Sequence, residues 1–148
     1  MYSFLAVMGC VAVLAGLPAM AADRIGHVKI TSGDVQIARD GAMFAAEAGA
    51  ELFEKDVITT GDNSAVGMTF SDNSRMSLGP NSELTLEAYS YEEAGQRPSF
   101  DARLSAGSLT AASGEIAKTR PLAMRVLMPT TVLGVKGTEF VVRVSSEE

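Results

Sequence analysis

The chain has 148 residues, a formal net charge of −6 and hydrophobic residues at 47% of its positions. An acidic chain with no cluster of Lys or Arg lacks the cationic surface that nucleic acids and anionic membranes require, which argues against both as partners. Its one cysteine, Cys10, lies in the N-terminal apolar segment. The remainder therefore has no disulfide or thiolate metal site, and its stability depends on apolar packing.

The first 21 residues predict a signal peptide. An uncharged apolar run extends from Phe4 to Leu17, and Ala19 and Ala21 are the small residues that signal peptidase requires before its cleavage site. We expect cleavage after Ala21, a periplasmic or secreted protein, and one mature domain over 22–148 with no membrane span. Two alternatives remain open. The segment stays uncleaved as an anchor, or, because it lacks the usual basic residues, the true start lies upstream.

From Ile25 onward, apolar and polar residues alternate in short runs, which is the pattern of half-buried strands. Turn sequences such as Ser32-Gly33-Asp34 and Gly79-Pro80-Asn81 separate these runs. Helical periodicity is nearly absent. Many short strands between regular turns predict an all-β domain, as in sandwiches, barrels and solenoids.

Two segments interrupt this alternation. Residues 42–52 are alanine-rich and bracketed by glycines, and we interpret them as a loop leading to a strand. Residues 90–99 are polar and predict an exposed loop. In the last strand, Val141 lies on the opposite face from its apolar neighbours, so we expect both faces to be covered. The glycines Gly134 and Gly137 are expected to permit a tight turn or a close backbone contact before that strand.

No catalytic, cofactor or metal site is predicted. The only histidine, His27, lies in a strand pattern and is expected to be solvated. The turns at Asp62-Asn63-Ser64 and Asp72-Asn73-Ser74 carry enough oxygen atoms to suggest calcium, but Asp and Asn favour turns for conformational reasons alone. We therefore interpret both as structural turns.

In order along the chain, several short motifs together resemble the FecR domain family. The first block contains Asp56-Val57-Ile58-Thr59-Thr60-Gly61, then Phe70-Ser71-Asp72-Asn73-Ser74 and Pro80-Asn81-Ser82. The second contains Leu104-Ser105-Ala106-Gly107-Ser108-Leu109 and ends in Pro129 and Gly137-Thr138-Glu139-Phe140. Asn73 and Lys136 stand where the family usually has glycine and arginine. The resemblance covers nearly all of the chain after residue 21.

This resemblance implies an all-β extracytoplasmic domain, solenoid-like or sandwich-like, without catalytic residues. The motif positions that it identifies, with an expected structural role, are Thr60, Gly61, Asp72, Ser74, Pro80, Asn81, Ser82, Gly107, Pro129, Gly137, Thr138 and Phe140. Signalling members of the family carry a sigma-binding segment and a membrane helix, and they communicate with an outer-membrane receptor. This chain shows neither addition, so we do not expect a complete sigma-regulating function.

We therefore expect a binding or sensory module, linked to cell-envelope signalling, that recognises a protein or an envelope polymer through strand edges and turn surfaces. Tyr89 and Tyr91 form a candidate binding loop, and packing at a sheet edge is the alternative role for them. Two other functions remain open: a structural module for assembly of the envelope, or an enzyme acting on envelope polymers. The enzyme would require Asp56, Asp62 or Asp72 to converge.

Overall fold

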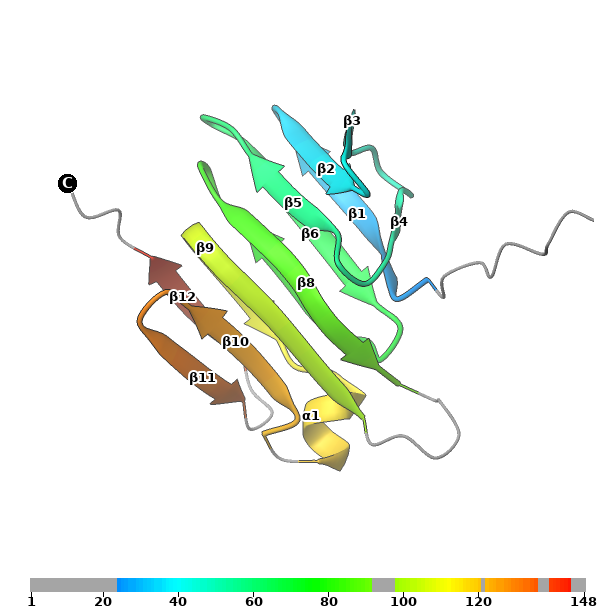
Figure 1. The fold of residues 1–148 in the computed structure, drawn as a ribbon, viewed down its shortest axis with the longest axis vertical. Helices are drawn as coiled ribbons and strands as arrows, with labels where there is room; N and C mark the ends of the chain where they lie inside the picture. The colour runs from blue at the N-terminus through cyan, green and yellow to red at the C-terminus, as the bar shows by residue number, and fades with distance from the viewer. Residues whose placement is uncertain (1–23, 92–97, 121, 136–138, 145–148) are drawn as a thin grey trace, which may run out of the picture.

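The computed structural model describes residues 24–91, 98–120, 122–135 and 139–144, and most of them lie in strands (Figure 1). The strands are β1 (Gly26–Ser32), β2 (Val35–Arg39), β3 (Ala42–Ala45), β4 (Glu51–Leu52), β5 (Val57–Thr60), β6 (Ala65–Phe70), β7 (Arg75–Leu78), β8 (Glu83–Ser90), β9 (Ser99–Ala112), β10 (Met124–Met128), β11 (Thr131–Val135) and β12 (Glu139–Val144). The helix α1 (Glu115–Thr119) follows β9. The predicted all-β class is confirmed. The predicted signal peptide lies outside the described residues.

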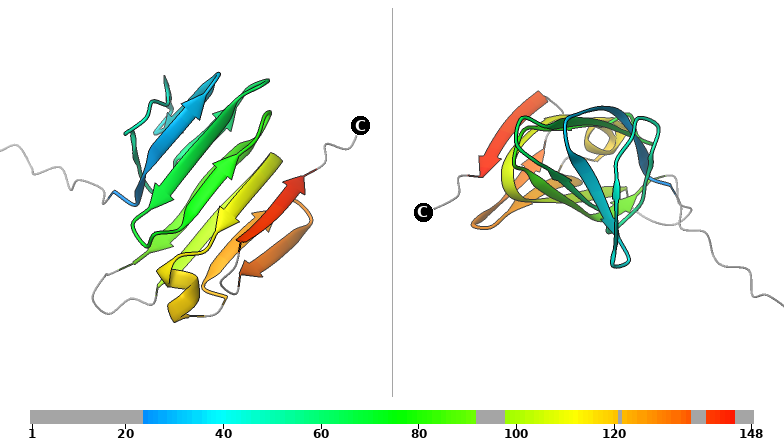
Figure 2. Two further views of the ribbon diagram at one scale, coloured as in Figure 1. Left: turned by 180° about the vertical axis from the view of Figure 1, so that it is seen from behind. Right: turned by 90° about the horizontal axis from the view of Figure 1, so that it is seen from above.

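The strands form one curled sheet with β9 at its centre. The first half of β9 pairs with β8 and β10, and its second half pairs with β7 and β12. The sheet continues from β9 in the order β8, β5, β2, β3 on one side and β7, β6, β1, β4 on the other. The two sides curl toward each other and enclose the core, as the view from above shows (Figure 2). This curled sheet has the shape of a half-barrel (Figure 2). The finer prediction of a solenoid-like or sandwich-like arrangement stays a prediction.

The chain crosses between the two sides of the sheet at a row of tight corners. These corners lie between β1 and β2, between β5 and β6, between β7 and β8, and inside β9 at Gly107. Gly33, Asn63, Asn81 and Gly107 all have a positive φ at these places. Glycine and asparagine tolerate this left-handed backbone better than other residues. The predicted turn sequences therefore coincide with the corners at which the backbone is left-handed.

The alternation that predicted the strands also places the core. In β6, Val66, Met68 and Phe70 are buried, and the residues between them are not. Strands β7 and β8 follow the same pattern. The largest fully buried side chains are Ile37, Leu52, Ile58, Met68, Met76, Leu78, Leu84, Leu86, Phe100, Leu104, Leu109 and Ile116. These apolar side chains supply the main stabilisation of a domain that has no disulfide in this part of the chain.

The expected loop over residues 42–52 instead contains two short strands, β3 and β4. β3 forms a hairpin with β2 through Asp40 and Gly41, whose φ angles of 49° and 80° suit a two-residue hairpin turn. All four residues of β3 are exposed. Because neither face of β3 is buried, its sequence shows no alternation, which is why the strand was not predicted.

One expectation for the C-terminal region was wrong, and for Gly134 only the first of its two expected roles was wrong. Val141 is 67% exposed, so β12 is not covered on both faces. Gly134 lies inside β11, opposite Arg125 of β10, and not at a turn. A Cβ at Gly134 would lie 2.8 Å from Cδ2 of Leu122. The close contact that was the alternative reason for this glycine is therefore present, made by a side chain.

Candidate functional site

Three turns share one construction, an Asn with positive φ followed by a buried Ser. The pairs are Asn63-Ser64, Asn73-Ser74 and Asn81-Ser82. Each Ser hydroxyl accepts a hydrogen bond from the backbone amide of a distant segment: Ser64 from Asp34 at 2.8 Å, Ser74 from Gly114 at 3.2 Å, and Ser82 from Ser108 at 3.0 Å. Because a buried amide without a partner is costly, these hydroxyls stabilise the junctions between segments.

The motif residues of the first block meet at the corner between β7 and β8. Thr60 accepts a hydrogen bond from the amide of Ser82 at 2.9 Å, and its hydroxyl donates to the carbonyl of Gly79 at 2.6 Å. The amide of Asn81 donates to the carbonyl of Gly61 at 3.1 Å. The sequence motif therefore marks residues that hold consecutive corners together.

Gly107 belongs to the same row of corners. A Cβ at this position would collide with the Oγ of Ser82 and lie 2.5 Å from its Cα. The backbone of Gly107 also has a φ of 84°. Both the space and the conformation therefore require glycine where β9 bends from one side of the sheet to the other.

Asp72 is the centre of a second polar cluster, at the rim beside α1. Its carboxylate is buried and accepts hydrogen bonds from the hydroxyl of Ser74 at 2.6 Å and from the amide of Ile116 at 3.2 Å. Gly114 packs directly on this turn, where a Cβ would collide with the carbonyl of Asp72. The two motif residues Asp72 and Ser74 thus fix the start of α1.

Tyr89 completes this cluster from the strand β8. Its hydroxyl accepts a hydrogen bond from the amide of Asp72 at 2.9 Å and donates to the carboxylate of Asp72 at 3.2 Å. Its half-buried ring lies 4.9 Å from the ring of Phe100, which in turn lies 4.7 Å from Phe70. Burial, followed by the nearby charge of Asp72, raises the pKa of Tyr89 well above its usual value. These contacts favour the packing role for Tyr89, and Tyr91 is half-buried against the same core.

A third polar cluster, which sequence reasoning missed, joins β2 to the segment before β5. Arg39 donates two hydrogen bonds to Asp56, from Nε at 2.8 Å and from Nη2 at 2.7 Å. The hydrogen bond to Asp56 raises the pKa of Arg39 above its usual value. The guanidinium carbon lies 4.5 Å from the ring centre of Phe53 and 5.1 Å from that of Phe44, within cation-π range. No local sequence pattern links Arg39 to Asp56, because they lie 17 positions apart.

The three carboxylates that an enzyme would need do not all gather at one end of the sheet. Asp56 and Asp62 precede and follow β5, so they lie at opposite ends of that strand, and Asp62 and Asp72 flank β6 in the same way. Asp56 is paired with Arg39, while Asp72 holds the start of α1. His27 is exposed on β1. Within the described ranges, no group of three His, Cys, Asp or Glu residues is arranged to hold a metal ion.

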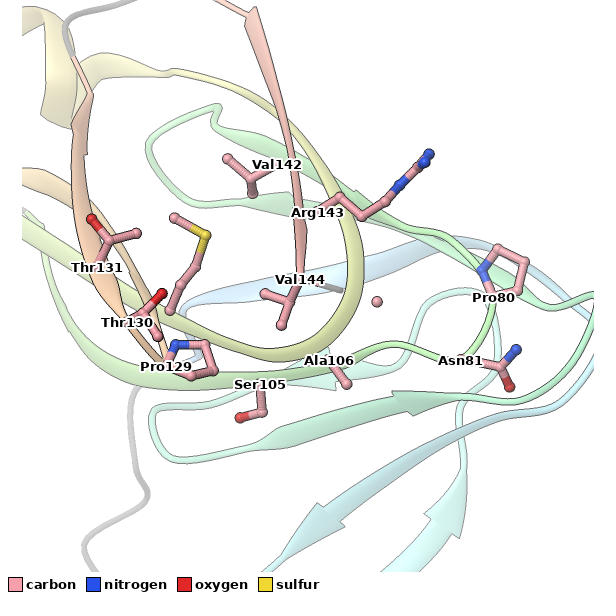
Figure 3. Close-up of a pocket in the computed structure, with 12 residues that line it drawn as sticks. Pro80, Asn81, Ser105, Ala106, Pro129, Thr130, Thr131, Val142, Arg143 and Val144 are labelled. Carbon is pink, nitrogen blue, oxygen red and sulfur yellow. The ribbon is translucent and has the colours of Figure 1, made fainter. Parts of the chain in front are cut away.

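A groove lies beside the C-terminal strands of the sheet (Figure 3). It has a volume of about 830 Å³ and lies between the hairpin of β10 and β11 and the strand β12. Its apolar walls come mainly from Met128, Pro129, Val142 and Val144, and its polar groups include those at Asn81, Ser105, Thr130 and Thr131. Among the described strands, β11 pairs with β10 alone and β12 with β9 alone. A groove that combines apolar walls with polar groups can accept an extended chain.

The groove also brings together predicted motif positions from both blocks. Pro80, Asn81 and Gly107 line it from the corner row, and Pro129 lines it from the turn between β10 and β11. Phe140 lies on the half-buried face of β12 and packs against the core. The remaining motif positions, Gly137 and Thr138, lie outside the described residues.

The part of the chain that the structure describes has no helix long and apolar enough to cross a membrane. Its curled sheet, its hydroxyl-linked corners and its groove define a small all-β module. A family model described as FecR protein matches residues 56–148, which is more than half of the chain. The chain therefore belongs to the FecR family, as the motif order predicted. Comparison with curated proteins and with solved structures gives no match.

Proposed function

We propose that this chain is a non-catalytic, extracytoplasmic binding module that takes part in cell-envelope signalling by binding an extended segment of a protein partner. Membership of the FecR family supports a role related to envelope signalling. The uncharged apolar segment at the N-terminus supports a location outside the cytoplasm. An envelope polymer in place of a protein segment is the alternative ligand.

The observation that carries this proposal is the groove between the β10–β11 hairpin and β12. Its lining is mainly apolar and also includes the hydroxyl of Thr130, the amide of Asn81 and the guanidinium of Arg143, a combination suited to a peptide that needs both burial and hydrogen bonds. Family motif positions line it at Pro80, Asn81, Gly107 and Pro129. The same residues that shape the corners therefore also shape the proposed binding surface.

The proposed surface differs from the loop at Tyr89 and Tyr91 that the sequence suggested. The hydroxyl of Tyr89 is engaged with Asp72 and its ring contacts Phe100, so this side chain contributes to packing at the rim. The groove instead exposes apolar and polar groups together. We therefore place the binding surface at the C-terminal end of the sheet.

The test is capture of partners from an envelope extract with the full chain and two variants. Thr130→Trp places a large ring in the groove from an exposed position. Val132→Trp is the matched control, because Val132 is exposed on the neighbouring strand β11 and does not line the groove. We expect the wild type and Val132→Trp to retain the same partner and Thr130→Trp to lose it. Circular dichroism checks that all three proteins are folded. Equal capture of the partner by all three would contradict the groove as the binding site.

Protease treatment of the captured material distinguishes the two ligand classes. Loss of the bound component after proteolysis identifies a protein partner, whereas its survival identifies an envelope polymer and contradicts the protein-segment form of the proposal.

A further inference from the structure

Four strands of the described sheet have one edge without a described partner: β3, β4, β11 and β12. An open edge presents a row of amide and carbonyl groups and can pair with another chain. The strand β4 has only two residues, and β3 and β11 carry no charged residue. β12 is the longest of the four, with six residues, and it alone carries charges of both signs.

The charges of β12 are placed symmetrically about Val141. Glu139, Val141 and Arg143 are exposed on one face of the strand, and Phe140, Val142 and Val144 are half-buried on the other. Glu139 lies two positions before Val141 and Arg143 two positions after it. Among the described residues, no ion pair involves Glu139 or Arg143 within the chain.

This symmetry matters for pairing between two identical strands. In an antiparallel pair, residues directly opposite each other point to the same face of the sheet. A twofold axis at Val141 places Val141 opposite Val141, Glu139 opposite Arg143, and Arg143 opposite Glu139. Registers centred on Phe140 or Val142 lose both of these Glu–Arg pairs. Only one register therefore makes the exposed face of β12 complementary to itself in charge.

We propose that β12 is a homotypic docking edge, which pairs antiparallel with β12 of a second copy of this chain in the register centred on Val141. The pairing would extend the sheet from β9 through β12 into the second copy, since β12 already pairs with β9 along its other edge. It also shields Val141, which is 67% exposed in the single chain. An interface made by one strand is small, so the dimer is weak and depends on concentration.

This inference goes beyond the proposed function because it concerns the outer edge of β12 and the exposed face of that strand. Val142 and Val144 line the groove from the half-buried face of β12, and Arg143 also borders it, whereas Glu139 and Val141 do not line it. The Glu139→Arg and Val141→Cys variants therefore test the edge of β12 without altering the lining of the groove. The Thr130→Trp variant, which tests the groove, is therefore expected to leave the dimer unchanged. Failure of one proposal is thus distinguishable from failure of the other.

The first test uses charge reversal, with analytical ultracentrifugation of the full chain over a range of concentrations. Arg143→Glu and Glu139→Arg each place like charges opposite each other at both pairs, which raises the dimer dissociation constant on the order of tenfold. The double variant Glu139→Arg with Arg143→Glu restores opposite charges and is expected to restore the wild-type constant. Lys29→Glu, on an exposed position of β1, makes the same charge change as Arg143→Glu without affecting β12.

The second test fixes the register by disulfide formation. Opposite residues in antiparallel strands have Cα atoms about 4.5–5.5 Å apart, within reach of a disulfide. In a Cys10→Ser background, Val141→Cys is expected to form a covalent dimer under mild oxidation. Adding Arg143→Glu to this variant is expected to reduce the yield of the dimer. Val132→Cys, 55% exposed on β11, is the matched control that stays monomeric. Equal cross-linking of both cysteine variants, or a failure of the double charge variant to restore association, would overturn the proposal.

Discussion

Asp72 and Ile116 are joined across 44 positions of the chain by a hydrogen bond of 3.2 Å from the amide of Ile116 to Oδ2 of Asp72. The helix α1 has Gly114 as its N-cap residue, so its first amides have no N-cap side chain to which they can donate a hydrogen bond. A buried carboxylate from the turn between β6 and β7 therefore replaces the local cap. Because Asp72 also accepts from Ser74, this one side chain connects a turn, a helix and, through Tyr89, the strand β8.

Replacement of Asp72 by Ala is expected to lower the free energy of unfolding by about 1–3 kcal/mol, since buried donors at Ser74 and Ile116 lose their acceptor. Asp72→Asn retains one acceptor oxygen and should cost less. Urea unfolding of the full chain measures both values. The control is Asp62→Ala, in an exposed turn of the same type, which should change the value by no more than about 0.5 kcal/mol. Equal effects at the two positions would contradict the role given to Asp72.

Gly107→Ala should destabilise the domain more than Gly41→Ala. Both glycines have positive φ, 84° at Gly107 and 80° at Gly41, so the conformational cost of alanine is similar, about 1 kcal/mol. Only at Gly107 does a Cβ meet other atoms, those of Ser82, whereas nothing lies within 4 Å at Gly41. We expect a further loss of about 1–3 kcal/mol at Gly107 by thermal or urea unfolding. Equal losses would show that the corner can adjust to a side chain.

Sequence patterns predicted the parts of this fold in which one face of a strand is buried. The alternation in β6 and β7 survives in the structure because the curled sheet has an inside and an outside. Sequence patterns did not predict β3, because this strand buries neither face. They also did not predict α1, because its five residues are too few for helical periodicity to appear. The turn preferences of glycine and asparagine located the corners, since residues such as Asn63 and Asn81 tolerate the positive φ found there.

The sites depended on information that no local pattern contains. The order of the motifs identified the family, and the structure shows that Thr60, Asn81 and Ser82 serve as links between corners. The groove was not predicted, because it arises from the placement of the β10–β11 hairpin relative to β12. The pairing of Arg39 with Asp56 likewise depends on how β2 lies beside β5. A repeated Asn-Ser pair was the one available signal for the turn hydroxyls.

The raised pKa of Tyr89 predicts that the domain loses stability at alkaline pH. Its pKa is raised in the folded protein, first by burial and then by the charge of Asp72, so the neutral phenol is the form that the fold holds. Its contribution is therefore fully present below its unfolded pKa of about 10 and is lost as the pH rises above that value toward the folded pKa.

Tyr89→Phe tests this dependence. At neutral pH the variant should be less stable by about 1 kcal/mol, because the phenol no longer bonds to Asp72. The difference should shrink as the pH passes about 10, where only the wild type has this phenol to ionise. Urea midpoints at a series of pH values give the comparison. A difference that stays constant into alkali would contradict the assignment.

The pairing of Arg39 with Asp56 should matter more than an exposed ion pair of the same type. Asp56 is fully buried and the Arg39 side chain is 30% exposed, so Arg39→Met leaves a buried carboxylate without its partner. Allowing for the partial exposure of the guanidinium, we expect a loss of about 2–3 kcal/mol.

Arg39→Lys keeps the charge but not the two parallel hydrogen bonds, and it should give an intermediate loss. The control is Arg24→Met, which removes an exposed pair with Glu51 and should cost less than about 0.5 kcal/mol. Urea unfolding distinguishes these cases. Similar losses for Arg24→Met and Arg39→Met would contradict the importance of burial.

The central position of β9 also determines when the domain can fold. Four strands, β7, β8, β10 and β12, take their hydrogen-bond partners from it, and two of these precede it in the chain. A nascent chain that has not reached Ser99 holds β7 and β8 with unsatisfied edges and a core without Phe100 and Leu104. Such contacts between distant positions make β-rich domains slow to fold. Fragments that end before β9 are thus expected to aggregate or be degraded, and the domain is expected to stay unfolded until β9 has been synthesised.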